Sequence, residues 1–265
     1  MNDTLTPPSQ TSDRSKTPRA TGINWFKYAA PKTFYPVAGW LMRGCGAGAA
    51  LLTVAGLVIG LLLAPTDFQQ GEAYRIIFVH VPAAWMSMVI FVAMAGWSAI
   101  GLAFNARLAF MLARALAPTG ALMCFLALWT GALWGKPTWG TWWVWDARLT
   151  SQLILLFLYL GYLALHAAID DTRRADRAAS VLALVGVVNV PIIYFSVIWW
   201  NTLHQGASVS ATAAPKMAAI MLTGMLVMAI AFWLYTIAVT MARLRIIINE
   251  REAETTWMNK LQEGA

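Results

Sequence analysis

Six long apolar stretches, separated by short polar segments, dominate the hydrophobic pattern of this 265-residue chain. A helix needs about 20 apolar residues to cross the hydrocarbon core of a bilayer, and each stretch is long enough to do so. The predicted spans are 44–64, 83–104, 112–133, 149–169, 179–199 and 216–241. The pattern therefore predicts an all-α integral membrane protein with six transmembrane helices.

Polar segments flank the six-span membrane domain, which we predict at 25–245. The first 24 residues are rich in Pro, Ser and Thr and contain no apolar core. We expect them to form a disordered cytoplasmic tail rather than a cleaved signal peptide. Residues 246–265 are predicted to form a second cytoplasmic tail.

The composition supports a membrane protein and excludes some other classes. Hydrophobic residues make up 59% of the chain and charged residues 12%, whereas soluble domains carry about 25% charged residues. The net charge of +7 does not indicate nucleic-acid binding, because the charges lie between apolar runs and form no basic face. Cys45 and Cys124 have no metal-binding or disulfide spacing, so we assign them to packing.

The distribution of Lys and Arg predicts the orientation of the spans. With both termini in the cytoplasm, 15 of the 19 basic residues fall on that side. The other side holds only Arg75, Lys136, Arg148 and Lys216. Because short cytoplasmic loops carry the excess of basic residues, segment 65–82, the loop 134–151 and segment 200–215 are predicted to lie on the outer face.

The outer segment WGKPTWGTWWVWDARLTS, residues 134–151, holds five tryptophans. An aromatic belt at the membrane interface accounts for one or two tryptophans at a helix end, but poorly for five in one short loop. The alternative is a platform of rigid rings for a large flat ligand, which the composition favours. Its members are Trp134, Trp139, Trp142, Trp143 and Trp145.

Two of the three histidines are predicted at a similar depth on the outer face. His80 precedes the second span and His204 follows the fifth, whereas His166 lies near the cytoplasmic end of the fourth and is assigned to packing. Either outer histidine alone is typical of the interface. Together, beside the tryptophans, they indicate the two axial ligands of a haem iron, because a single zinc ion would require four ligands.

The outer charges have two interpretations each. Arg75 and Arg148 could pair with the two propionates of a haem, since Arg binds carboxylates in bidentate fashion. Alternatively, Arg75 pairs with Glu72, and Arg148 with Asp146 or a lipid phosphate. Asp146 precedes the fourth span and is also a candidate helix cap.

The tryptophan run with its terminal WDARLTS resembles the "WWD" signature of the haem-handling proteins of c-type cytochrome maturation. The six spans and the positions of the histidines resemble, among these, the family of cytochrome c maturation protein C, also called haem exporter protein C. The resemblance covers residues 25–245. Related families with the same signature have many more spans.

The resemblance implies a multi-pass protein of the bacterial inner membrane that binds haem b at the periplasmic face. It implies delivery of the haem to a periplasmic haem chaperone, maturation protein E. The implied partners in the membrane are the ABC-transporter components, maturation proteins A and B, and the small one-span maturation protein D. His80 and His204 match the family's axial ligands, and Arg75 a basic residue near the haem edge. The haem and chaperone-docking loop would contain Trp134, Trp139, Trp142, Trp143, Asp146 and Arg148.

Two further functional classes remain open at this stage. A permease subunit for haem or a small solute would need polar groups at mid-membrane, for which Asn189 is the best candidate. A scaffold with a purely structural aromatic belt would need no ligand. We do not expect an enzyme, because the outer segments contain no pair of nucleophile and general base.

Overall fold

The computed structural model describes residues 25–200, 202, 204 and 217–263. Across these residues the chain is helical and contains no strand, apart from one isolated bridge between Asp67 and Gly71. The elements are η1 (Trp25–Ala29), α1 (Pro31–Leu57), η2 (Val58–Leu63), η3 (Glu72–Ile76), α2 (Ile77–Phe104), α3 (Arg107–Trp139), α4 (Ala147–Ala168), α5 (Thr172–Gly186), α6 (Asn189–Trp199), α7 (Ala219–Glu252) and α8 (Thr256–Glu263).

Six helical segments of the described chain are long and apolar enough to cross a membrane. They are α1 continued by η2, η3 continued by α2, then α3, α4, α5 with α6, and α7. The predicted all-α fold with six spans is therefore confirmed.

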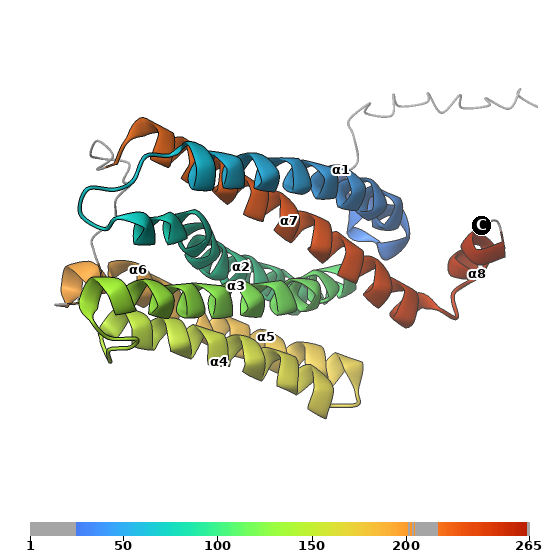
Figure 1. Cartoon of the computed structure of the whole chain (residues 1–265). Coiled ribbons are helices and arrows are strands. Elements are labelled where there is room, and N and C mark those ends of the chain that lie inside the picture. Colours follow the sequence, from blue (N-terminus) through green and yellow to red (C-terminus); the bar gives the residue numbers. More distant parts are fainter. Residues whose placement is uncertain (1–24, 201, 203, 205–216, 264–265) are drawn as a thin grey trace, which may run out of the picture.

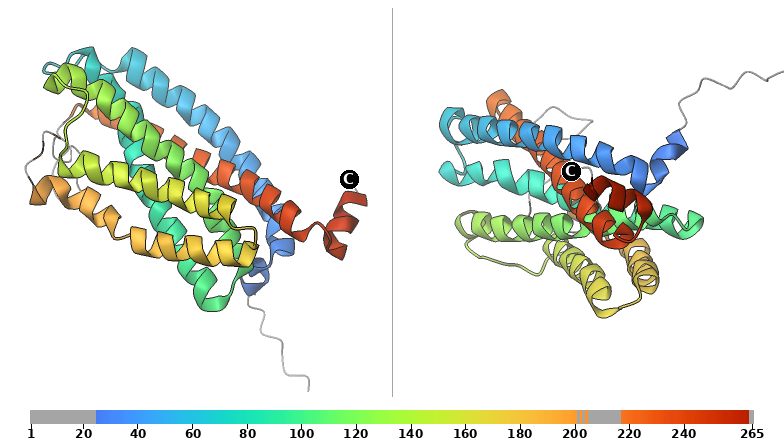
Figure 2. Two further views of the ribbon diagram at one scale, coloured as in Figure 1. Left: turned by 90° about the horizontal axis from the view of Figure 1, so that it is seen from below. Right: turned by 90° about the vertical axis from the view of Figure 1, so that its right-hand side faces the viewer.

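The helices are arranged in three layers, as Figure 1 shows. α1 lies along α7, α2 lies along α3, and α4 lies along α5, with the α2–α3 layer in the middle. Figure 2 shows that the start of α1 and the end of α7 lie at the same end of the bundle. The Trp-rich segment after α3 lies at the opposite end (Figure 1).

Small side chains allow neighbouring helices to approach closely. Gly101 of α2 lies against the ring of Phe110 at the start of α3, and an added Cβ would come within 2.6 Å of it. Gly120 of α3 lies against the ring of Tyr159 in α4 in the same way. The turn between α2 and α3 uses Asn105 in the left-handed conformation, with φ 49°, which Asn tolerates better than most residues.

The fifth span is interrupted between α5 and α6. Pro191 has no backbone N–H and cannot donate to the carbonyl of Val187, which would be its partner in a continuous helix. The N–H of Val190 donates to that carbonyl instead, at 3.0 Å. The span therefore consists of two shorter helices rather than one.

Two helices extend further toward the Trp-rich end than the sequence suggested. α2 begins at Ile77 and continues through Pro82, which costs one backbone hydrogen bond but does not end the helix. His80 therefore lies on α2 and not before the span. α3 continues to Trp139 and ends at Gly140, which has φ 77°, a typical helix C-terminus.

The extension of α3 changes the predicted loop of 134–151. Trp134 and Trp139 lie on α3, so only residues 140–146 connect α3 to α4. At the other end of the bundle, the predicted domain boundary at residue 245 falls inside α7, which continues to Glu252. Met258 of α8 then packs into a core with Tyr35 and Leu244.

A buried ion pair joins α5 to α7 at the end remote from the Trp-rich segment. Arg251 donates two hydrogen bonds to the carboxylate of Asp176, at 2.8 and 2.9 Å. Asp176 is only 5% exposed. Bidentate geometry of this kind fixes the relative position of the two helices.

We expect Asp176→Ala to destabilise the protein by roughly 3–5 kcal/mol, because Arg251 would remain buried without its partner. The midpoint of thermal unfolding in detergent measures this effect. It is followed with a thiol-reactive dye in a Cys45→Ser background, so that the signal reports exposure of the buried Cys124. Asp170→Ala, at an exposed position in the bend before α5, is the control and should leave the midpoint unchanged. Equal midpoints for both variants would contradict a stabilising role of the pair.

Candidate functional site

A cavity of about 480 Å³ lies among α2, α3, α4 and α6 at the Trp-rich end of the bundle. Its walls are mainly apolar, with Ile77, Val81, Leu128 and Ile193 among them. This size and character are typical of a small-molecule or cofactor site. Of the ten residues predicted from the sequence, the structure brings six into the lining: His80, His204, Trp134, Trp139, Trp143 and Arg148.

The two predicted histidines face each other across this cavity. The centroids of the His80 and His204 rings are 6.3 Å apart, and the rings are inclined by 29°. Both side chains therefore border the same cavity. The two side chains come from positions 124 residues apart in the sequence.

Each histidine is held by a different neighbour. His80 is buried, and its Nδ1 lies 3.0 Å from Oγ1 of Thr130 on α3. Nδ1 of His204 lies 3.4 Å from a guanidinium nitrogen of Arg148 on α4. The main chain of His204 also donates to Oγ1 of Thr202 at 2.9 Å.

Three tryptophans pack around the histidines. Trp134 meets the His80 ring edge-on, with centroids 5.7 Å apart, and donates its indole N–H to Oε1 of Gln70 at 2.7 Å. Trp139 lies 6.1 Å from the His204 ring. Trp143 lines the cavity, and its indole N–H is buried without a partner among the described residues. These rings form the aromatic wall that the platform hypothesis requires.

The remaining two tryptophans lie outside the cavity lining. Trp142 is 54% exposed and Trp145 is 77% exposed. Trp145 contacts Trp143 edge-on at 5.4 Å, and Lys136 lies 6.0 Å from the ring centroid of Trp142. The five tryptophans thus divide into an inner group of three and an outer group of two.

Asp146 acts as the N-cap of α4. Its Oδ1 accepts a hydrogen bond from the N–H of Leu149 at 2.8 Å. This was one of its two interpretations from the sequence. Its Oδ2 is buried and has no partner among the described residues. Asp146 lies outside the cavity lining.

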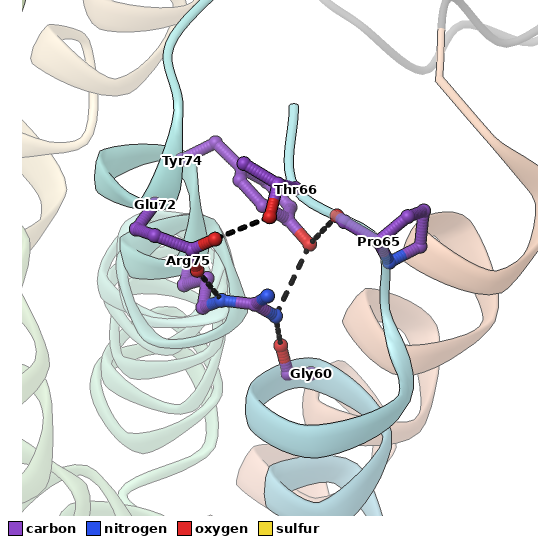
Figure 3. Close-up of polar contacts among 6 residues, drawn as sticks. All are labelled: Gly60, Pro65, Thr66, Glu72, Tyr74 and Arg75. Carbon is purple, nitrogen blue, oxygen red and sulfur yellow. Dashed lines mark hydrogen bonds and ion pairs between the residues drawn. The ribbon is translucent and has the colours of Figure 1, made fainter. Parts of the chain in front are cut away.

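Arg75 forms its polar contacts with residues at and next to the segment that connects α1 to α2, as Figure 3 shows. Its guanidinium pairs with Glu72 and donates to the carbonyl of Gly60 in η2. Tyr74 donates to the carbonyl of Pro65 at 2.7 Å. The pairing with Glu72 was the alternative to a propionate contact, and the structure does not bring Arg75 into the cavity lining.

Sequence reasoning missed two residues of the cavity lining, Gly131 and Gln152, and also Thr130, which is bonded to His80. Thr130 bonds His80, and Gly131 lies beside it, where an added Cβ would be 3.1 Å from Cε1 of that ring. Gln152 lines the cavity and donates to Oγ of Ser87 at 2.9 Å. A signal for Thr130 existed, because it lies one helical turn before Trp134 and shares its face.

Two residues considered in the sequence lie elsewhere. His166 packs against Tyr162, 5.1 Å between ring centroids, and lies 3.9 Å from Asp176, near the opposite end of the bundle. Asn189 donates to the carbonyl of Ser151 at 2.8 Å and so joins α6 to α4.

The fold and the site together define a multi-pass membrane protein with an apolar cavity that two histidines and three tryptophans line. The sequence profile of the family described as "Heme exporter protein C" matches residues 24–259, and the chain belongs to this family. It is a multi-pass protein of the bacterial inner membrane.

Three relatives illustrate the similarity. "Heme exporter protein C" of Escherichia coli K12 is 45% identical over 234 residues, which is 88% of this chain and 94% of the relative. The protein of the same name from Haemophilus influenzae is 44% identical over 89% of this chain and 96% of the relative. That from Bradyrhizobium diazoefficiens is 50% identical over 79% and 81%.

The capping role of Asp146 gives a prediction that separates the effect of its hydrogen bond to α4 from the effect of its negative charge. Asp146→Ala should destabilise the protein by about 0.5–2 kcal/mol, because it removes the oxygen that accepts the Leu149 N–H. Asp146→Asn keeps an acceptor oxygen and should unfold near the wild-type temperature. Thermal unfolding in detergent distinguishes the two variants. Equal destabilisation by both would show that the charge matters and not the cap.

Proposed function

We propose that this protein holds haem b in the cavity between His80 and His204 and delivers it, at the periplasmic face, to a periplasmic haem chaperone. Membership of the family gives the chain a role in haem handling for cytochrome c maturation, within a haem exporter complex. The single observation that carries the proposal of haem binding and delivery is the pair of imidazole rings in an apolar cavity, with ring centroids 6.3 Å apart.

The residues present suit a haem. Its macrocycle is flat and apolar, and Trp134, Trp139 and Trp143 offer flat apolar surface with little conformational entropy to lose. When bound, haem would supply an iron that accepts two imidazole nitrogens as axial ligands. Among the described residues, no group of three His, Cys, Asp or Glu could hold a bare metal ion.

Arg148 is the cationic group that suits a haem propionate. Its guanidinium lines the cavity, and the described residues offer it no ion pair with Asp146. A carboxylate that leaves water at the edge of a membrane needs a charged partner. We propose that Arg148 binds a propionate, whereas Arg75 stabilises the loop that precedes α2.

The position of the cavity supports delivery rather than enclosed storage. It lies at one end of the bundle, where Trp142 and Trp145 are exposed beside it. We propose that this end faces the periplasm, that the exposed tryptophans contact maturation protein E, and that maturation proteins A, B and D complete the complex. The protein's contribution would be binding and orientation, without an enzymatic step of its own.

A permease function receives less support. Asn189, the polar residue on which that hypothesis depended, uses its side-chain N–H to join α6 to α4. Its polarity is therefore explained by packing between the two helices. We expect Asn189→Leu to lower stability and to leave the haem spectrum of the folded protein unchanged.

The first test is the absorption spectrum of the purified protein after haem loading. We expect a low-spin spectrum with split bands for the wild type, lost or altered in both His80→Ala and His204→Ala. The third histidine provides a matched control, because His166 lies in the last turn of α4, whereas the cavity is lined by residues from the first turns of that helix. His166→Ala should keep the wild-type spectrum. A colourless wild type after loading would overturn the proposal.

A second test separates haem binding from delivery. Trp142→Ala combined with Trp145→Ala removes exposed rings outside the cavity, so we expect a wild-type haem spectrum. We expect at least a tenfold loss of haem transfer to the chaperone, because exposed aromatic residues of this kind often dominate an interface. Haem staining of the chaperone in membranes measures the transfer. Trp40→Ala, another exposed tryptophan on α1, is the control. Normal transfer by the double variant would exclude these rings as the contact.

A further inference from the structure

The hydrogen bonds around His80 determine which of its two ring nitrogens carries the hydrogen. Oγ1 of Thr130 lies 2.5 Å from the carbonyl oxygen of Leu126, one turn earlier on α3. Two oxygens approach this closely only with a proton between them, and a carbonyl has none to give. The single hydroxyl proton of Thr130 is therefore used for Leu126.

Oγ1 of Thr130 can then act only as an acceptor toward His80. Since Nδ1 of His80 lies 3.0 Å away, this nitrogen must be the donor and carry the proton. In a neutral imidazole the other nitrogen, Nε2, then keeps its lone pair. Thr130 is the only side chain among the described residues that forms a hydrogen bond to His80, and the backbone of Ala127, on the same helix, is a second partner of the imidazole.

The orientation of the His80 ring is fixed from the same helix. Gly131 leaves space for the ring, because a Cβ there would be 3.1 Å from Cε1. Trp134, one turn after Thr130, packs its ring edge-on against the imidazole at 5.7 Å. Three residues of α3 thus limit both the rotation of the ring and its tautomer.

His204 differs from His80 in this respect. Its Nδ1 faces the guanidinium of Arg148 at 3.4 Å, and a guanidinium can only donate. The contact therefore requires an unprotonated Nδ1, which is the opposite tautomer to that of His80. Only His80 has its tautomer set in advance for ligation through Nε2.

We propose that Thr130 is a positioning residue that holds His80 as the Nδ1–H tautomer and so prepares Nε2 as a ligand nitrogen before haem arrives. The inference rests on the proposed function, because it assigns a role to a residue behind a proposed axial ligand. Hydrogen bonds from the second nitrogen of a ligating histidine fix its tautomer and raise its basicity, and their loss typically costs 10–100-fold in metal affinity.

The test compares three variants in the complete, haem-free protein labelled with ¹⁵N-histidine. The chain has three histidines, so their signals are assigned from single His→Ala variants. Thr130→Val removes the hydroxyl at nearly constant shape, and Thr130→Ser restores it. Thr236→Val is the matched control, since Thr236 is also buried and bonds the carbonyl four residues earlier, at 2.8 Å, but lies on α7 and forms no hydrogen bond to His80.

We expect His80 to be protonated at Nδ1 in the wild type, in Thr130→Ser and in Thr236→Val, and to shift toward the Nε2–H tautomer in Thr130→Val. Haem titration should show a loss of affinity of about 10–100-fold for Thr130→Val only. Thr130→Ala serves as a second hydroxyl-free variant if Thr130→Val does not fold.

Two results would overturn the inference: an Nε2–H tautomer of His80 in the wild type, or an unchanged tautomer and haem affinity in the hydroxyl-free variants. The tautomer is measured without haem, so failure of the proposed function is distinguishable. It would appear as a wild type that binds no haem while His80 is still held at Nδ1–H by Thr130.

Discussion

His80 and Thr130 come within hydrogen-bonding distance because α2 and α3 pack closely along their length, and the rest of the site is arranged around this contact. Small residues at the interface of these two helices, such as Gly101 and Gly131, allow the approach. Close van der Waals packing and hydrogen bonds between helices stabilise membrane bundles in the absence of a hydrophobic driving force. Within the bundle a buried hydroxyl or imidazole costs free energy unless it is hydrogen-bonded. The pairing of the two residues meets this requirement for both.

The second side of the site comes from α4, α6 and His204, with one polar bond that connects it to α2 and another that joins α6 to α4. Gln152 of α4 donates to Ser87 of α2, and Asn189 of α6 donates to the carbonyl of Ser151. Arg148, at the start of α4, reaches His204. His80 is thus held by the packed helices α2 and α3, whereas His204 is held by Arg148, a cation that a ligand carboxylate would also attract. This difference suits the proposed function, in which the site would first bind haem and later release it.

Irregular backbone occurs in this protein where side chains or a proline account for it. Gly60 lies in η2, the π-helical end of the first span. Its carbonyl accepts a hydrogen bond from Arg75 (Figure 3). The break at Pro191 leaves α6 as a short separate helix that lines the cavity. Backbone N–H and C=O groups in a membrane must find hydrogen-bond partners within the protein. At the first break the side chain of Arg75 is such a partner, and at the second the short helix α6 lines the cavity.

The sequence alone determined the all-α fold and the six spans, because both follow from composition over about 20 residues. It also supplied the residue types of the proposed site, such as His80 near a dense run of tryptophans. The division of the tryptophans into inner and outer groups could not be read from it. That division depends on α3 continuing to Trp139, which turns part of an apparent loop into a helix face. The tertiary structure also assigned Arg75 to Glu72 and Gly60, and brought Thr130 to His80 across 50 residues of sequence. A local pattern records which groups a chain contains and how its segments fold, but which groups meet is decided by the packing of helices distant in the sequence.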